Sequence, residues 1–227
     1  MSEPALASVR VWDLPTRSFH WLLAAAVTGS VVSAKIGGGA MVWHFRFGYV
    51  VLTLVCFRLL WGVLGGRWSR FASFTYAPAT VLRYLRGRAA PAEHLDVGHS
   101  PTGAASVFAL LGILAVQLGT GLVADDEIAN QGPLYKFVSS ETALTATSWH
   151  KSWGQWLLLG LVALHIAAIV FYLLKKHTDL ITPMLRGDKL LPRGTPASAD
   201  GAAQRARALV LVALCAALAW WVARQAG

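Results

Sequence analysis

The fold is indicated first by residues 149–174, WHKSWGQWLLLGLVALHIAAIVFYLL, which end at the Lys175-Lys176 pair. About 20 apolar residues, each rising roughly 1.5 Å, cross the hydrocarbon of a bilayer, so this stretch predicts a transmembrane helix. It contains His150 and His165, and ionisable side chains are rare inside such helices unless they have a function. Their spacing puts the two rings roughly 22 Å apart along the helix and within about 60° of one face. One metal ion could not bind both, whereas two separate cofactors could each take one ligand.

A second stretch repeats the start of the first. Residues 43–48, WHFRFG, match residues 149–154, WHKSWG, in the Trp-His pair, in a following cation and in a final glycine. Residues i and i+4 share a helix face, so Gly48 and Gly154 are each expected one turn beneath a histidine. A glycine there leaves a gap in which a flat cofactor such as a haem could lie. A small residue also serves close packing of two helices, which is the alternative interpretation.

Composition places the chain among membrane proteins. Hydrophobic residues make up 56% of the 227 residues and charged residues only 14%, which is too apolar for an ordinary soluble domain. The formal net charge of +9 could suggest nucleic-acid binding, but the cations cluster between apolar spans, which argues against it. Cys56 and Cys215 lie inside apolar spans, so we expect neither a disulfide nor a cysteine metal site.

Five apolar spans predict an all-α integral membrane protein: about residues 18–34, 47–64, 103–123, 149–174 and 208–222. Asp13 precedes the first span and is expected to cap its helix, and His20 and Trp21 in its opening turn argue against a cleaved signal peptide. The four longer spans predict a four-helix transmembrane domain over residues 8–190. Residues 191–227 are expected to form a linker and a fifth, C-terminal transmembrane helix. That span is only about 15 residues long, so whether it crosses fully stays open.

The distribution of cations predicts the orientation. The N-terminal tail and the segments 67–100 and 175–207 together carry 14 of the 20 Lys and Arg residues. Because the positive side faces the cytoplasm, we expect a cytoplasmic N-terminus, a cytoplasmic linker 191–207 and residues 124–148 outside. Arg58, late in the second span, is expected to reach the inner surface. Residues 76–88 predict a short helix on the inner leaflet.

With this orientation the histidines separate by depth. His44 and His150 open the second and fourth spans at the outer side, and His20 and His165 lie toward the inner side. Two pairs are therefore predicted, His44 with His150 and His20 with His165. The three histidines of the hydrophilic segments, His94, His99 and His177, are expected to be solvated.

Two facing imidazoles suit the two axial positions of a haem iron, whereas zinc usually takes four protein ligands. We therefore predict two b haems (protohaem IX), each with two histidine ligands. Arg46 and Lys151 lie beside the outer pair, and Arg17 and Lys175 lie at the inner end, where they could bind the haem propionates. The alternative is that these cations are interfacial anchors, which we prefer for Lys175.

The quoted motifs resemble the prokaryotic cytochrome b561 family, which includes the cytochrome b subunits of nickel–iron hydrogenases. The resemblance covers roughly residues 8 to 190 and rests on six stretches: VWDLPTR with FHW (11–21), HFRFG (44–48), RLLWG (58–62), GHSPTG (98–103), TGL with the Asp125-Asp126 loop, and Pro183-Met184. It implies a four-helix di-haem core in the bacterial inner membrane, with His20, His44, His150 and His165 as ligands. The fifth span departs from a four-span member and leaves the branch of the family open.

The resemblance also implies electron exchange with the quinone pool, usually for a periplasmic partner. That partner could be a c-type cytochrome docking on the acidic loop 125–141, although the loop could equally be only solvated. One alternative is a membrane-anchor subunit of a hydrogenase or dehydrogenase, and an alternative of another class is a haem carrier or chaperone without redox function. Whether the chain is itself a quinone oxidoreductase stays open. Gln117 in the third span could contact a quinone or a propionate, or hydrogen-bond to a neighbouring helix.

Overall fold

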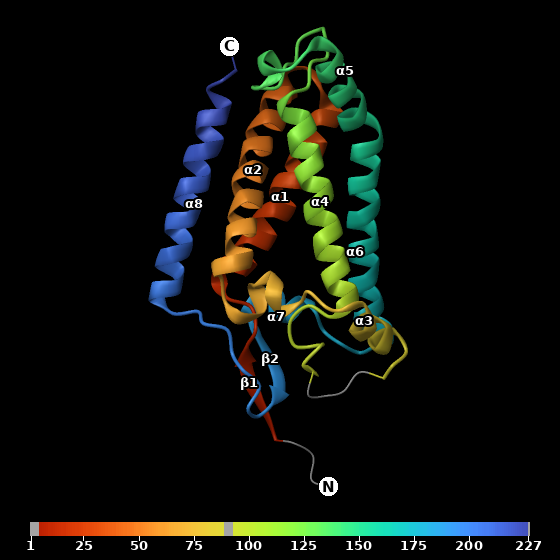
Figure 1. Cartoon of the computed structure of the whole chain (residues 1–227), viewed down its shortest axis with the longest axis vertical. Coiled ribbons are helices and arrows are strands. Elements are labelled where there is room, and N and C mark those ends of the chain that lie inside the picture. The colour runs from red at the N-terminus through yellow and green to blue at the C-terminus, as the bar shows by residue number, and fades with distance from the viewer. Residues whose placement is uncertain (1–4, 89–92, 227) are drawn as a thin grey trace. The chain divides into compact units, whose positions relative to one another are not determined.

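The computed structural model describes residues 5–88 and 93–226 and is dominated by long apolar helices (Figure 1). Within these residues, five helical stretches are long and apolar enough to cross a membrane: Leu14–Ile36, Gly38–Leu64, Pro101–Leu122, Ser140–Lys175 and Ala202–Ala223. The predicted all-α membrane fold is thus confirmed. The last stretch is longer than the sequence suggested, because its apolar part is extended by a polar first turn that remains helical.

The spans are built from α1 (Leu14–Ile36), η1 (Gly38–Ala40) with α2 (Met41–Leu64), α4 (Pro101–Leu122), α5 (Ser140–Trp149) with η6 (His150–Gly154) and α6 (Gln155–Lys175), and α8 (Ala202–Ala223). The shorter elements are β1 (Leu6–Arg10), η2 (Arg67–Ser69), η3 (Phe71–Ser73), α3 (Pro78–Leu85), η5 (Tyr135–Phe137), α7 (Ile181–Arg186) and β2 (Asp188–Pro192). The second and fourth helices begin before the predicted spans, so His44 and His150 lie within helices rather than at their first residues.

The chain forms two compact units, each described by itself. The first unit comprises Met1–Ser18, Arg58–Phe108 and His165–Leu209. The second comprises Phe19–Phe57, Ala109–Leu164 and Val210–Gly227.

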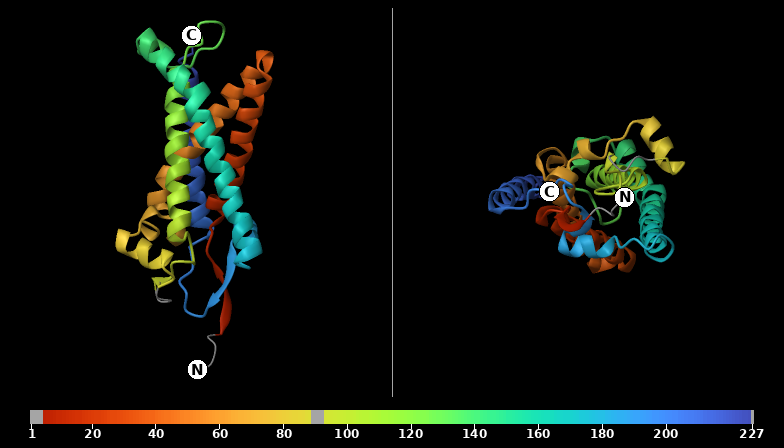
Figure 2. Two further views of the ribbon diagram at one scale, coloured as in Figure 1. Left: turned by 90° about the vertical axis from the view of Figure 1, so that its right-hand side faces the viewer. Right: turned by 90° about the horizontal axis from the view of Figure 1, so that it is seen from below.

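In the second unit, four helices share one apolar core (Figure 1, Figure 2). Its buried members come from all four: Ala26 of α1, Val51 and Val55 of α2, Leu114 of α4 and Leu158 of α6. Small residues let the backbones approach, as membrane helices require. A Cβ on Gly29 would lie 2.7 Å from the ring of Phe47, so the glycine is what lets that ring pack against α1.

In the first unit, Asp13 caps the start of α1, as the sequence predicted. Its Oδ1 accepts a hydrogen bond from Thr16 N at 2.8 Å, and Oδ1 and Oδ2 also accept from Trp61 Nε1, Gly66 N and the Ser69 hydroxyl. The carboxylate is fully buried, and these donors compensate its desolvation. The cap therefore also fixes the segment after α2 against the start of α1.

The first unit also contains a two-stranded sheet that the sequence did not predict. Strands β1 and β2 pair antiparallel, with Leu6 opposite Pro192 and Arg10 opposite Asp188, and lie side by side in Figures 1 and 2. Arg10 Nε contacts Asp188 Oδ1 at 2.9 Å. Gly187 turns the chain from α7 into β2 with a φ of 96°, which favours glycine.

Two predictions about this unit are wrong. Arg58 does not reach the surface: it is 3% exposed, and its guanidinium stacks 4.7 Å from the ring of Phe71. Gly62, one turn later in α2, provides the space for that ring, because a Cβ there would collide with it. His99 is not simply solvated, since its ring packs 4.7 Å from Trp12 and 4.5 Å from Phe74.

Candidate haem site

A cavity of about 370 Å³ lies within the second unit. It is lined by residues of α1, α2, α4, η6 and α6, and both His44 and His150 face it. The predicted outer pair of histidines is therefore brought together by the fold, from α2 and from η6.

The ring of His44 is held by α1. Its Nδ1 lies 2.9 Å from the carbonyl oxygen of Ser30 and 3.0 Å from the hydroxyl of the same residue. A carbonyl oxygen can only accept, so Nδ1 carries the proton in this bond. In a neutral imidazole the other nitrogen, Nε2, then has the free electron pair that a metal needs.

His150 is held in the same way, by α4. Its Nδ1 donates to the carbonyl oxygen of Gln117 at 3.0 Å, and the side-chain amide of Gln117 donates back to the carbonyl oxygen of His150 at 3.2 Å. The ring centres of His44 and His150 are 6.0 Å apart, with planes at 81°. Both rings are thus oriented by backbone carbonyls, and both leave Nε2 as the available ligand atom.

This pair fits a metal between the rings. With metal–nitrogen bonds of about 2.0 Å on either side, two imidazole ring centres stand roughly 6 Å apart, which agrees with the spacing of His44 and His150. In the described residues, no group of three or more His, Cys, Asp or Glu side chains could hold a metal ion. A porphyrin supplies its own donor atoms to its iron, so two histidines are enough protein ligands for a haem.

The family model of prokaryotic cytochrome b561 matches residues 11–187, more than three quarters of the chain. The chain belongs to this family. Neither a curated protein nor a solved structure matches it. Membership makes the chain a multi-pass bacterial membrane cytochrome of the b type, with b-type haem as its cofactor and electron transfer as its role.

The two glycines of the repeated motif differ in this cytochrome. Gly48 lines the cavity, and a Cβ there would meet nothing within 4 Å. Gly154 faces Gln117 and Trp149 instead. The reason is local: residues 150–154 form a π-helix, whose wider turn changes the direction of the residue four positions after His150.

Sequence reasoning missed Gly121 of α4, which occupies the position against the second histidine. A Cβ on Gly121 would lie 2.8 Å from Cε1 of His150. The glycine therefore lets the His150 ring lie against α4 and reach the carbonyl of Gln117. Gly121 could have been found from its position four residues after Gln117, which puts it on the same helix face as the polar residue of the third span.

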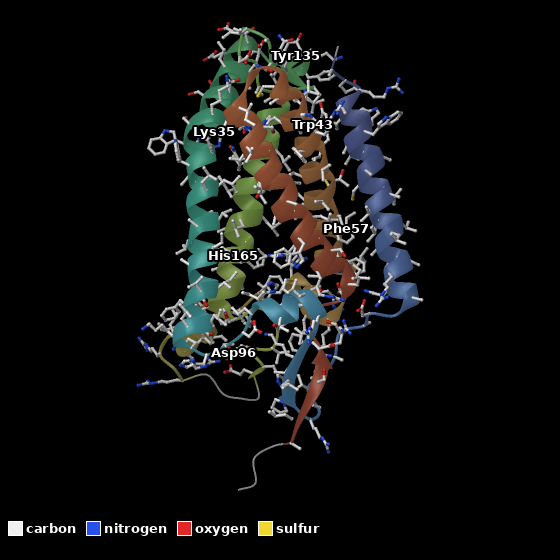
Figure 3. The ribbon with its side chains drawn as sticks, turned by 180° about the vertical axis from the view of Figure 1, so that it is seen from behind. Lys35, Trp43, Phe57, Asp96, Tyr135 and His165 are labelled. Atoms are coloured by element: carbon white, nitrogen blue, oxygen red, sulfur yellow. The ribbon has the colours of Figure 1, made fainter. Side chains whose placement is uncertain are left out.

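Of the cations predicted beside the outer pair, Lys151 lines the cavity and Arg46 is not among its lining residues. The guanidinium of Arg46 stacks 4.8 Å from the ring of Trp43. Lys35, in the last turn of α1 and labelled in Figure 3, lines the cavity as well, and its Nζ lies 5.5 Å from the ring of Trp156. Two lysines thus bring positive charge to the cavity, one of which the sequence analysis had not selected.

Lys151 is also linked to the loop after α4. Its Nζ lies 3.7 Å from Asp126 Oδ2. Burial raises the pKa of Asp126, but hydrogen bonds from the Asn130 side chain and from the backbone of residues 128–130 outweigh it and hold the pKa below its usual range. The carboxylate therefore stays charged and keeps the loop ordered beside the cavity.

The residues predicted for an inner site divide between the two units. His20 belongs to the second unit, where its ring meets Trp21 edge-on at 4.9 Å. His165 belongs to the first unit, where its Nδ1 lies 3.4 Å from the Ser106 hydroxyl. Arg17, also in the first unit, donates to the carbonyl of Leu185 at 2.6 Å and lies 3.9 Å from Asp200, so it already ties α1 to the segment around α7.

Proposed function

We propose that this cytochrome transfers electrons between membrane quinone and a redox protein outside the inner membrane, through two b haems. His44 and His150 would hold the outer haem. For the inner haem we retain His20 and His165, on the sequence spacing of 15 residues between His150 and His165.

The observation that carries the proposal is the matched anchoring of the outer pair. Each ring donates from Nδ1 to a backbone carbonyl, of Ser30 or of Gln117. Such second contacts fix the tautomer and increase the basicity of the ligating nitrogen. Two histidines that only filled space would not both need Nδ1 bonded to a backbone carbonyl, with both rings facing the same cavity.

The charges at the cavity support an anionic cofactor. Haem propionates are carboxylates, and Lys35 and Lys151 are the cavity-lining cations of the described residues. We assign the outer propionates to these two lysines in place of Arg46. The Nζ of Lys151 also lies 3.7 Å from Asp126 Oδ2, beside the cavity.

The chemistry of the site is electron transfer. Two protein ligands leave the haem iron without a position for oxygen or a substrate, so the bound haem supplies a reversible one-electron couple. The protein contributes orientation, through the bonds to Ser30 and Gln117, and an apolar surround, through residues such as Val51 and Leu158. Nothing in this arrangement calls for a proton transfer at the ligand nitrogens.

The direction across the membrane rests on the cation distribution, which puts the His44 ends of the helices outside and the N-terminus in the cytoplasm. The loop 125–141 would then offer Asp125 and Glu127 to a basic partner, such as a c-type cytochrome or the electron-transfer subunit of a hydrogenase or dehydrogenase. The remaining surface of the spans faces lipid.

The test is a two-sided reaction with the purified protein. A soluble quinol analogue should reduce haem, and an oxidised basic c-type cytochrome should then reoxidise it, both followed in the haem absorption bands. Haem that dithionite reduces but that neither quinol reduces nor quinone oxidises would contradict the proposal.

A further inference from the structure

A row of hydroxyl groups lies in the first unit, outside the cavity described above. The Tyr84 hydroxyl of α3 donates to Asp96 Oδ1 at 3.0 Å and lies 3.2 Å from the Tyr172 hydroxyl of α6. Carboxylate, phenol and phenol thus form a continuous hydrogen-bonded chain between a loop and a transmembrane helix.

Further hydroxyls lie at the start of α4. The hydroxyls of Ser100 and Thr102 are 3.2 Å apart. Ser106 follows Thr102 by four residues on the same face of α4, and its hydroxyl is 3.4 Å from Nδ1 of His165.

The two ends of this row lie in different surroundings. Asp96 is exposed, and Lys189 fixes its loop by donating to the carbonyls of Asp96 and Val97 at 3.1 and 2.8 Å. Tyr172 lies within α6, seven residues after His165, which is two turns further along the same helix face. Figure 3 labels Asp96 and His165. The row therefore connects an exposed carboxylate to α6, two turns away from a proposed haem ligand.

The residues of the row suit proton conduction. Burial raises the pKa of Tyr84, and the hydrogen bond with Tyr172 raises it further, so the phenol keeps its proton at neutral pH. A protonated phenol can accept one proton and pass on another, and it does not have to ionise in between. A carboxylate at the water end can collect protons. If these groups only joined α3 to α6, the bond between the Tyr84 and Tyr172 hydroxyls would be enough. The exposed carboxylate of Asp96, which accepts from Tyr84, would not be needed for that contact.

We propose that Asp96, Tyr84 and Tyr172 form a proton relay for the quinone reaction at the His165 end of the bundle. Reduction of a quinone to a quinol needs two electrons and two protons. Bound haem would supply the two electrons one at a time, and Asp96, Tyr84 and Tyr172 would pass the two protons from water toward the quinone. In quinol oxidation the same groups carry two protons outward while two electrons pass to haem.

This inference rests on the proposed quinone function, and the experiment separates the two. The variants are Asp96→Asn, Tyr84→Phe and Tyr172→Phe in the full-length haem-loaded protein, each of which keeps the shape of the side chain. The control is Tyr76→Phe, which removes a hydroxyl of the same unit that donates to the carbonyl of His99 at 2.6 Å and does not belong to the row. Haem reduction is followed after mixing with a quinol analogue or with dithionite, in H₂O and in D₂O.

The relay variants should reduce haem from quinol more slowly by a factor on the order of 100, the low end for a positioned proton-transfer group. Their rates should also show a larger solvent isotope effect, whereas their haem content and dithionite rates should match Tyr76→Phe. Wild-type rates from quinol in all three variants would overturn the relay and leave the quinone function intact. A wild-type protein that does not react with quinol at all would overturn both.

Discussion

Gly121 offers a sharp perturbation of the outer histidine pair. Replacing it with alanine adds a Cβ 2.8 Å from Cε1 of His150, where ordinary contact begins near 3.4 Å, so the ring must move by at least about 0.6 Å. The ring cannot move freely, because its Nδ1 bonds to the carbonyl of Gln117 at 3.0 Å.

The expected cost follows from that conflict. Overpacking of this kind costs about 1–3 kcal/mol, and loss of the hydrogen bond about 0.5–1.5 kcal/mol more. Without haem, His150 can relieve the overpacking by giving up its bond to Gln117, whereas a bound haem would hold the ring in place, so the cost of overpacking falls mainly on the haem-bound state. At 1.4 kcal/mol per factor of ten, the outer haem should bind roughly 5- to 150-fold more weakly if overpacking alone acts. Gly121→Leu should abolish its binding.

Gly119→Ala is the matched control, because this position lies on the same helix and a Cβ there would meet nothing within 4 Å. Haem per chain is measured after purification and again after challenge with a haem-binding protein, together with the optical spectrum. Gly121→Ala should lose outer haem in the challenge while Gly119→Ala behaves as wild type. Equal retention in the two variants would refute the role given to Gly121.

Three further predictions concern charge, loop and orientation. Lys35→Gln and Lys151→Gln should each lower the midpoint potential of the outer haem, because a positive charge near the iron disfavours the oxidised state. Arg46→Gln should leave that potential unchanged. Redox titration measures the three potentials, and a shift in Arg46→Gln alone would return the propionate contact to Arg46. The pKa of Asp126 is lowered on folding, so its contribution to stability is present above the ordinary carboxylate pKa and is lost as the pH falls below that range. Wild type should therefore be more thermally stable than Asp126→Asn at neutral pH and should lose this excess in acid. A difference in thermal stability that does not change with pH would contradict the role given to the Asp126 carboxylate. In protein without Cys56 and Cys215, Ser139→Cys should react with an impermeant thiol reagent in intact cells and Ser73→Cys should not, whereas the reverse pattern would invert the orientation.

The transmembrane spans could be predicted because hydrophobic length alone determines them. All five spans were predicted, and so was the start of α1 at Asp13, because a capping carboxylate before an apolar run is a local signal. It could not give the β1–β2 pairing, because Arg10 and Asp188 meet only after the chain has passed through four spans. Arg58 was misjudged for a related reason: the segment that buries it, around Phe71, returns onto α2 through tertiary contacts.

The candidate site could also be predicted only in part. The pairing of His44 with His150 was predicted from the repeated motif and from the similar depth of the two histidines in the membrane. The π-helix at residues 150–154 has no recognisable sequence signal, and it changes the environment of Gly154. Gln117 was noticed as a polar residue in an apolar span, but its contact with His150 depends on the rotation of α4 about its axis, which hydropathy does not fix.

The central claim is that His44 and His150 hold one haem between them. The most direct measurement is low-temperature spin resonance with redox titration on His44→Ala, His150→Ala and His165→Ala. If one haem lies between them, His44→Ala and His150→Ala should remove the same low-spin signal and keep the other, and His165→Ala should remove the signal that they keep. Loss of different signals in His44→Ala and His150→Ala would contradict it.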